Sequence, residues 1–140
     1  MEQQNFYNIR IFAVFDENEL DTRFIKGNIQ RYINKEQIII HQDKFMDFFY
    51  MKDLISLVEF YILNKDVDKQ IDCSYITMYK LSDIANMINK LSDYKVDTVI
   101  ERKEMSKPYI GTFSGIVLNE FIGLQQGIKN VYFKLNESNI

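Results

Sequence analysis

The sequence has no tryptophan, one proline, one cysteine, one histidine and five glycines in 140 residues. The single cysteine, Cys73, excludes an internal disulfide and a cysteine-based zinc site, and we expect it to be a small core residue. The single histidine, His41, leaves a Ser-His-Asp triad or a two-histidine metal site incomplete within this chain. No apolar run approaches the roughly 18 residues that a membrane-spanning helix requires.

The charge of the chain is small and dispersed. The net charge is −3, and the densest basic run, residues 102–107, is interrupted by Glu104, which indicates a solvated loop and no nucleic-acid surface. The composition, 46% hydrophobic and 26% charged, is typical of soluble globular proteins. Residues 1–5 are polar, unlike a signal peptide. The sequence therefore predicts one soluble, cytoplasmic domain of 140 residues that does not bind nucleic acid or a membrane.

The rest of the chain is arranged around residues 45–63. The first part of this stretch is rich in aromatic residues and lacks glycine and proline, which favours a strand. From residue 53 onward apolar residues cover most of a helical wheel, which predicts a helix buried on nearly every side. Asp53 is the predicted N-cap of this helix.

The segments before this stretch predict two strands and a helix. Residues 9–15 carry apolar side chains on both faces, as in an interior strand. The acidic residues that follow, between Asp16 and Asp21, lack the pattern of a calcium loop and are better explained as charges favouring a helix N-terminus. That helix is predicted over residues 21–34, and residues 37–41 are predicted to form a strand that pairs as a hairpin with the next one.

The segments after the central stretch continue the alternation of strands and helices. Strands are predicted over residues 70–75 and 94–101, and an amphipathic helix over residues 77–91, with Thr77 as its N-cap. The only proline, Pro108, requires extended chain. The fold class is therefore mixed α/β with short strands and four or five helices.

Several of these motifs resemble one family. Residues 45–54 resemble the (Arg)-Asp-Phe-aromatic-Tyr-Val-x-Asp-Leu segment of NAD-dependent nucleotide-sugar epimerases and dehydratases, the extended short-chain dehydrogenases. Residues 9–15 are similar to the family's last strand before the substrate lobe. Residues 77–91 and 124–135 are similar to its Leu-x-x-Ile-Ala helix and its terminal Leu-x-x-Gly-Ile helix. The resemblance also implies a short helix over residues 115–122, followed by the last helix over residues 124–135. The resemblance implies the C-terminal substrate-binding lobe of such an enzyme without most of its Rossmann domain, residues 9–15 standing for a late strand of that domain.

The parts that carry out this family's hydride transfer are not found in the sequence. The glycines at positions 27, 111, 115, 123 and 127 do not form a Gly-rich phosphate loop. The one Tyr-x-x-x-Lys match, Tyr61 with Lys65, lies in the predicted buried helix, and we interpret Tyr61 as a core residue. We therefore expect no catalytic residues, no metal and no bound cofactor in this chain alone, whereas a complete family member implies NAD(P).

The resemblance also marks positions where substrate would bind. Met46 stands where the family often has an arginine that grips the diphosphate, and Ala13 stands where many members have an asparagine. Asp16 replaces a family glycine. The candidate substrate-binding residues that remain are Arg23, Lys26, Tyr50 and Arg102.

Three interpretations of function remain open. The first is the substrate-binding portion of a nucleotide-sugar epimerase, dehydratase or reductase, inactive alone and joined by a cofactor-domain partner or a second copy. The second is a non-catalytic interaction or regulatory module that associates with itself or with another protein, because a lobe separated from a larger domain exposes apolar surface. The third is an independent α/β binding domain with no affinity for nucleotide-sugars.

Overall fold

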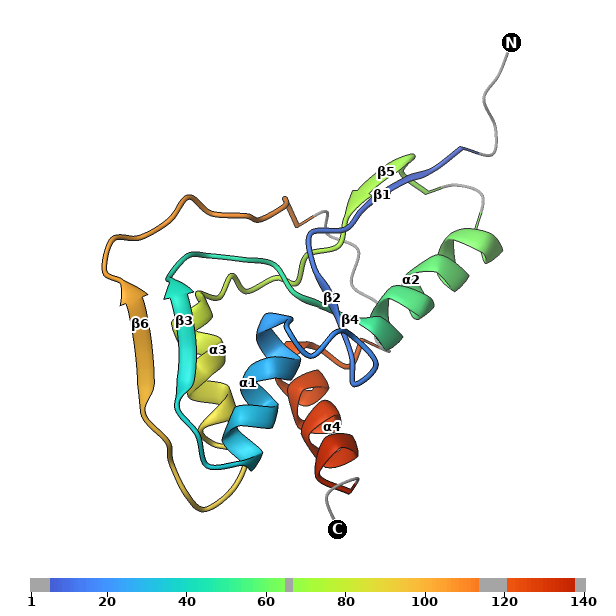
Figure 1. Ribbon diagram of the computed structural model, residues 1–140. Helices are drawn as coiled ribbons and strands as arrows, with labels where there is room; N and C mark the ends of the chain where they lie inside the picture. The colour runs from blue at the N-terminus through green and yellow to red at the C-terminus, as the bar shows by residue number, and fades with distance from the viewer. Residues whose placement is uncertain (1–5, 65–66, 114–120, 138–140) are drawn as a thin grey trace.

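Helices and small parallel sheets alternate in the computed structural model, which describes residues 6–64, 67–113 and 121–137 (Figure 1). The helices are α1 (Phe24–Ile33), α2 (Met51–Leu63), α3 (Leu81–Ile88) and α4 (Leu124–Glu137). The strands are β1 (Asn8–Arg10), β2 (Val14–Phe15), β3 (Ile38–Gln42), β4 (Phe49–Tyr50), β5 (Gln70–Asp72) and β6 (Thr98–Arg102). The mixed α/β class is confirmed, and the predicted helix over residues 115–122 falls mostly outside the described residues.

The strands pair as β1 with β5, β2 with β4 and β3 with β6, and every pair is parallel. The predicted hairpin is therefore wrong, because β3 pairs with β6 instead of with the segment that follows it. Asp43 explains why the chain does not turn back. Its carboxylate accepts hydrogen bonds from the backbone N–H and the hydroxyl of Ser82, at 3.1 and 2.6 Å, which holds residue 43 against the start of α3.

The predicted strand over residues 9–15 is two strands with different partners. β1 and β2 are separated by residues 11–13, where the chain crosses from one hydrophobic cluster to another. The smaller cluster lies between the β1–β5 pair and α2, which Figure 1 shows apart from the other helices. Its buried members are Phe49, Leu57, Tyr61, Ile71 and Cys73.

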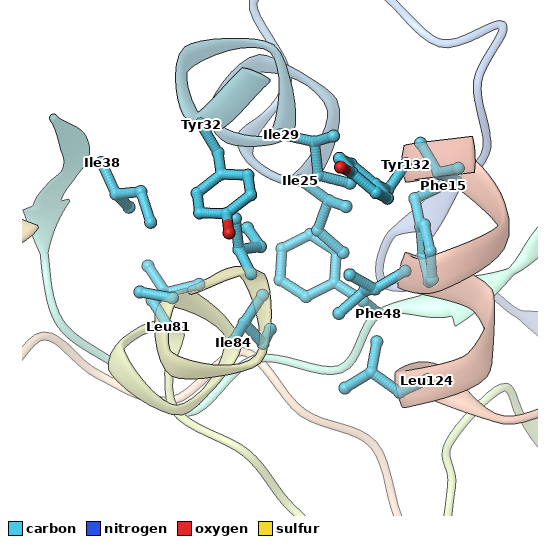
Figure 2. Packing of buried hydrophobic residues seen from close by; sticks show 14 of the residues in the cluster. Phe15, Ile25, Ile29, Tyr32, Ile38, Phe48, Leu81, Ile84, Leu124 and Tyr132 are labelled. Atoms are coloured by element: carbon cyan, nitrogen blue, oxygen red, sulfur yellow. The ribbon is translucent and has the colours of Figure 1, made fainter. Parts of the chain in front are cut away.

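The larger cluster lies among α1, α3, α4 and β3, and Figure 2 shows its side chains converging from these elements. The apolar face of α1 contributes Ile25, Ile29 and Tyr32, which are fully buried. The hydroxyl of Tyr32 donates to the carbonyl of Tyr94 at 2.8 Å, so its polar end is satisfied. The buried members of this cluster are Phe15, Ile25, Ile29, Tyr32, Ile38, Ile40, Phe48, Tyr50, Leu81, Ile84, Ala85, Ile88, Leu124, Ile128, Val131 and Tyr132.

Helix α2 has one buried face and one exposed apolar face, so the prediction of burial on nearly every side is wrong for this part of the fold. Asp53, Leu57 and Tyr61 are buried. On the other face Ile55 and Ile62 are 51% and 74% exposed. The sequence pattern is typical of a helix that is covered on both faces, whereas the described residues cover only the face of Leu57 and Tyr61.

Three buried aspartates hold the long connection between β6 and α4. The carboxylate of Asp47 accepts from the N–H of Gly111 at 2.7 Å, and that of Asp72 accepts from the N–H of Thr112 at 2.7 Å. A Cβ atom at residue 111 would lie 2.5 Å from a ring carbon of Phe12, so only glycine fits this approach. These contacts place residue 109 beside the strand break at residues 11–13.

The third aspartate, Asp53, corrects another prediction. It is not the N-cap of its own helix, because α2 begins two residues earlier and its N-cap is Tyr50. The Asp53 carboxylate instead accepts from the backbone N–H groups of Ile122 and Gly123, at 2.7 and 2.9 Å, and from the hydroxyl of Tyr75. It therefore caps the approach to α4, far away in sequence.

The start of α3 also differs from the prediction. The helix begins at Leu81 with Lys80 as its N-cap, so Thr77 lies in the preceding loop. The carboxylate of Asp83 accepts from the backbone N–H of Lys80 at 2.8 Å, which fixes this later start. Tertiary contacts reinforce it, since the N–H of Leu81 donates to the carbonyl of Lys44 at 3.0 Å.

Candidate functional site

A cleft of about 470 Å³ lies where the β1–β2 break meets the start of α1 and the segment before β4. A single backbone bridge joins Met46 to Tyr109 and so brings the connection after β6 to the same place. The cleft thus draws on four distant parts of the chain. Its lining residues are Phe12, Ala13, Val14, Glu19, Thr22, Arg23, Phe24, Met46, Phe48 and Tyr109.

The walls of the cleft are largely aromatic. The rings of Phe12 and Tyr109 meet edge to face with centroids 5.3 Å apart, and those of Phe24 and Phe48 are stacked at 5.9 Å. Tyr109 is 47% exposed, so its ring is accessible to a bound molecule. Such walls can pack against the planar or apolar faces of a ligand.

The polar side of the cleft carries Glu19 and Arg23. The two side chains approach each other at 4.0 Å, between Oε1 of Glu19 and Nε of Arg23, and the Glu19 side chain is only 12% exposed. Burial raises the pKa of Glu19 to about 7, because desolvation and nearby Asp16 outweigh the attraction of Arg23 and Lys26. The guanidinium of Arg23 is mostly exposed and can reach an anionic group in the cleft.

Lys26 lies next to this pair but is held by the preceding loop. Its ammonium donates to the carbonyl of Glu19 at 2.7 Å and pairs with Asp21 at 3.0 Å. The pKa of Asp21 is lowered, first because its carboxylate accepts a hydrogen bond from Lys26. Lys26 therefore shapes the loop over residues 16–22, and its role toward a ligand stays a prediction.

The other two predicted site residues lie elsewhere. Tyr50 belongs to β4 and is buried in the larger cluster, with its edge toward a smaller pocket of about 260 Å³ that Asn130 also lines. Arg102 is an exposed residue at the end of β6, opposite Gln42 of β3. The structure thus brings Arg23 and Lys26 together and separates them from Tyr50 and Arg102.

Sequence reasoning missed several cleft residues. Phe12 and Tyr109 are far apart in sequence and meet through long-range contacts, namely the bridge between Met46 and Tyr109 and the Asp47 and Asp72 hydrogen bonds to residues 111 and 112, so no local pattern marks them. Glu19 was assigned to a helix N-terminus along with its acidic neighbours. Its spacing of four residues from Arg23 was the one available signal.

A second, larger cavity of about 600 Å³ lies at the start of α4, beside the loop over residues 74–79. Phe113 and Phe121 also line it. Across residues 6–64, 67–113 and 121–137, no group of three or more acidic, histidine or cysteine side chains could hold a metal ion. None of the described helices is long and apolar enough to cross a membrane.

Solved structures share this arrangement. A UDP-glucuronic acid 4-epimerase from Bacillus cereus, solved with UDP-glucuronic acid and NAD, matches 96% of this chain with a TM-score of 0.68 and 15% identity. The UDP-N-acetylglucosamine 4-epimerase from Bacillus cereus matches 94% with a TM-score of 0.72 and 16% identity. The chain has the fold of about half of these epimerases.

The same match extends to a dehydratase and confirms the resemblance seen in the sequence at the level of fold. An NAD-dependent NDP-hexosamine 5,6-dehydratase of tunicamycin biosynthesis matches 95% of this chain with a TM-score of 0.65 and 17% identity. The chain spans only 46–48% of the length of these three proteins. No family model matches the sequence, and no curated protein does.

At its glycine-containing helix start, the described chain does not fit a dinucleotide cofactor. A dinucleotide pyrophosphate needs free backbone N–H groups at a helix start that follows a strand and a Gly-rich turn. At the glycine-containing start of α4, the N–H groups of Ile122 and Gly123 are already bonded to the carboxylate of Asp53. A second anion there would be repelled by this buried carboxylate.

Proposed function

We propose that this chain is the substrate-binding portion of an NAD-dependent nucleotide-sugar epimerase, dehydratase or reductase, and that it has no turnover by itself. The observation that carries the proposal is the cleft between the β1–β2 break and α1, with Ala13, Arg23 and Met46 in its lining. These are positions at which the sequence resemblance expects contact with a nucleotide-sugar. The fold shared with enzymes of this kind supports the proposal.

The chemistry of the cleft suits such a ligand. Its aromatic walls can pack against the faces of a base or a sugar ring. Met46 offers no donor, so Arg23 is the residue we assign to the diphosphate, where its planar fork of N–H groups matches phosphate oxygens. Lys26 contributes indirectly, because its bonds to the loop hold the residues around Arg23 in position.

The hydride chemistry must come from another part of the enzyme, and the exposed face of α2 is the surface we assign to it. A parallel sheet of two strands is normally part of a larger one with both faces covered. β1 pairs only with β5 among the described strands, and the face of α2 turned away from this pair exposes Ile55, Val58 and Ile62. On this proposal residues 1–140 form one substrate-binding lobe that docks on a cofactor-binding half through α2 and β1.

Calorimetric titration with UDP-glucose tests the binding role. The chain is expected to bind it, and Arg23→Gln should weaken binding about tenfold or more, because a charge-assisted hydrogen bond is worth roughly 1.5–3 kcal/mol. Arg31→Gln is the matched control, since Arg31 lies at the other end of α1 beside Glu36. Absence of binding, or equal loss in both variants, would contradict the assignment of the cleft.

The inactivity of the isolated chain is tested by incubating it with UDP-glucose and NAD and following the sugar product. No interconversion is expected, because the chain lacks a Gly-rich loop and the described residues offer no dinucleotide site. Measurable turnover that copurifies with the chain would overturn this part of the proposal.

The alternative function, a non-catalytic module that associates with itself or a partner protein, is favoured by the same exposed face of α2. Light scattering on the purified chain and on an Ile55→Glu, Ile62→Glu double variant tests whether this face mediates association. Association of the original chain that is lost in the variant supports a docking role for α2. If the original chain is strictly monomeric at micromolar concentration, this result argues against a lobe that associates through an uncovered apolar face.

A further inference from the structure

Glu19 is the one acidic side chain in the lining of the cleft, and its hydrogen bonding is incomplete. Its Oε2 atom is buried and has no hydrogen-bond partner. Its Oε1 atom is 4.0 Å from Nε of Arg23, beyond hydrogen-bond distance. A buried carboxyl oxygen without a donor is unfavourable, and such groups in native structures call for an explanation.

The loop around Glu19 does not supply the missing donor. The ammonium of Lys26 is used by the backbone carbonyl of Glu19 itself and by the carboxylate of Asp21. Asp16, the nearest other charge, is an acceptor that raises the cost of ionising Glu19. Within the lining, Thr22 and Tyr109 carry hydroxyls, and the remaining wall is the Arg23 fork and apolar side chains.

We infer that Glu19 is a specificity-determining residue of this cleft, which accepts a hydrogen bond from a sugar hydroxyl of the bound ligand. The inference rests on the proposed function and names the group that this end of the cleft recognises. Glu19 lines the cleft, so a ligand bound there lies beside its carboxyl group. A hydroxyl can donate to the carboxylate, whereas a phosphate would be repelled by it, so Arg23 and Glu19 divide the ligand between its anionic and its hydroxyl-bearing parts.

The hydroxyl can belong to the ribose or to the glycosyl group of a nucleotide-sugar, and three ligands separate these sources. Comparison of UDP-glucose with dUDP-glucose isolates the ribose 2′-hydroxyl. Comparison of UDP-glucose with the terminal methyl ester of UDP, which carries the same phosphate charge at pH 6 and pH 8, isolates the glycosyl group. Calorimetric titrations are carried out at pH 6 and pH 8 on the original chain, on Glu19→Gln and on Glu17→Gln. Glu17 is the matched control, because it carries the same charge two residues away and lines the separate pocket beside Tyr50.

The expected signature is a pH-dependent affinity ratio. Because the pKa of Glu19 lies at about 7, its carboxylate is mainly protonated at pH 6 and mainly ionised at pH 8, and a hydroxyl donates more strongly to the ionised form. For the ligand pair that differs in the hydroxyl bound by Glu19, the ratio of the two affinities should therefore rise about fivefold or more from pH 6 to pH 8. In Glu19→Gln this rise should disappear, and in Glu17→Gln it should persist.

The outcomes separate this inference from the proposed function. If the original chain binds none of the three ligands, the proposed function fails and the inference fails with it. If it binds them but neither ratio changes with pH or with Glu19→Gln, only the inference is overturned. An equal effect of Glu17→Gln would show a general charge effect and would also overturn it. Urea unfolding of each variant verifies that all three proteins are folded during the titrations.

Discussion

Asp53 is a fully buried carboxylate that joins two distant parts of the chain. It lies in the first turn of α2, yet its hydrogen bonds reach residues 122 and 123 and the hydroxyl of Tyr75. Three donors converge on one side chain, so each oxygen is satisfied by a partner from outside its own helix. The approach to α4, and with it the packing of that helix, depends on this single group.

Replacing Asp53 by asparagine should lower the free energy of unfolding by about 2–4 kcal/mol, since charge-assisted bonds weaken and the amide N–H₂ faces a backbone N–H donor in either orientation. Urea denaturation followed by circular dichroism measures this change. Glu59→Gln is the control, because Glu59 is an exposed residue of the same helix. If both variants unfold at the same urea concentration, the hydrogen bonds to the Asp53 carboxylate contribute little to stability.

Glu19 makes stability depend on pH. Its pKa rises on folding from an ordinary value of 4.5 to about 7, so the folded chain holds a proton that the unfolded chain releases between these pH values. The stabilising contribution of protonated Glu19 is therefore fully present below pH 4.5 and is lost as pH rises through 7. Glu19→Gln should gain stability relative to the original chain between pH 5 and pH 8, as measured by urea unfolding. A difference that does not change with pH would show that Glu19 titrates normally.

At the residue scale, the sequence identified types of residue better than their partners. Asp53 was recognised as a helix-start residue, but which N–H groups it meets depends on a segment about 70 positions away, which no local pattern contains. Arg23 was recognised through the family resemblance and does line the cleft. Glu19, Phe12 and Tyr109 were not, because only the tertiary fold brings them together.

Helix α2 shows what periodicity does and does not establish at the scale of elements. Its apolar residues predicted a helix correctly, with bounds two residues from the observed start. The pattern also indicated burial on nearly every side, whereas only the face of Leu57 and Tyr61 is covered by the described residues. A hydrophobic pattern reports that a face tends to be covered, and the protein or domain that covers it can lie outside the structure.

The two faces of α2 should respond differently to truncation. Leu57→Ala is expected to cost about 2–5 kcal/mol, because Leu57 is 1% exposed in the smaller cluster and truncation leaves a cavity. Ile62→Ala should change stability by less than about 0.5 kcal/mol, because Ile62 is 74% exposed. Chemical denaturation of both variants checks this orientation. A large loss in Ile62→Ala would mean that the exposed face is already buried in solution, by a second copy or by another segment.

Strand pairing is where the sequence predicted least. The predicted strands correspond to observed strands with shifted bounds. The hairpin was wrong, however, and the strand predicted over residues 9–15 is two strands. Alternating apolar residues report burial and carry little information on which strand lies alongside. Parallel pairs such as β3–β6 join segments about 60 residues apart, so long-range packing decides them.

At the scale of the whole molecule, the chain consists of two hydrophobic clusters with the cleft at the crossing between them. The larger cluster has helices on several sides and a filled core, whereas the smaller one has α2 and the β1–β5 pair. The uncovered side of α2 and the half-length match to the solved enzymes are what we expect of the lobe proposed above, which docks on a cofactor-binding half.

Binding of a nucleotide-sugar in the cleft over Ala13, Arg23 and Tyr109 can be tested by titrating ¹⁵N-labelled chain with UDP-glucose and following the amide chemical shifts. We predict shifts concentrated at residues 12–14, 19–24 and 109–111, with little change along β6. No shifts at saturating ligand, or shifts concentrated at residues 74–79 and 124–129 around the larger cavity, would contradict it.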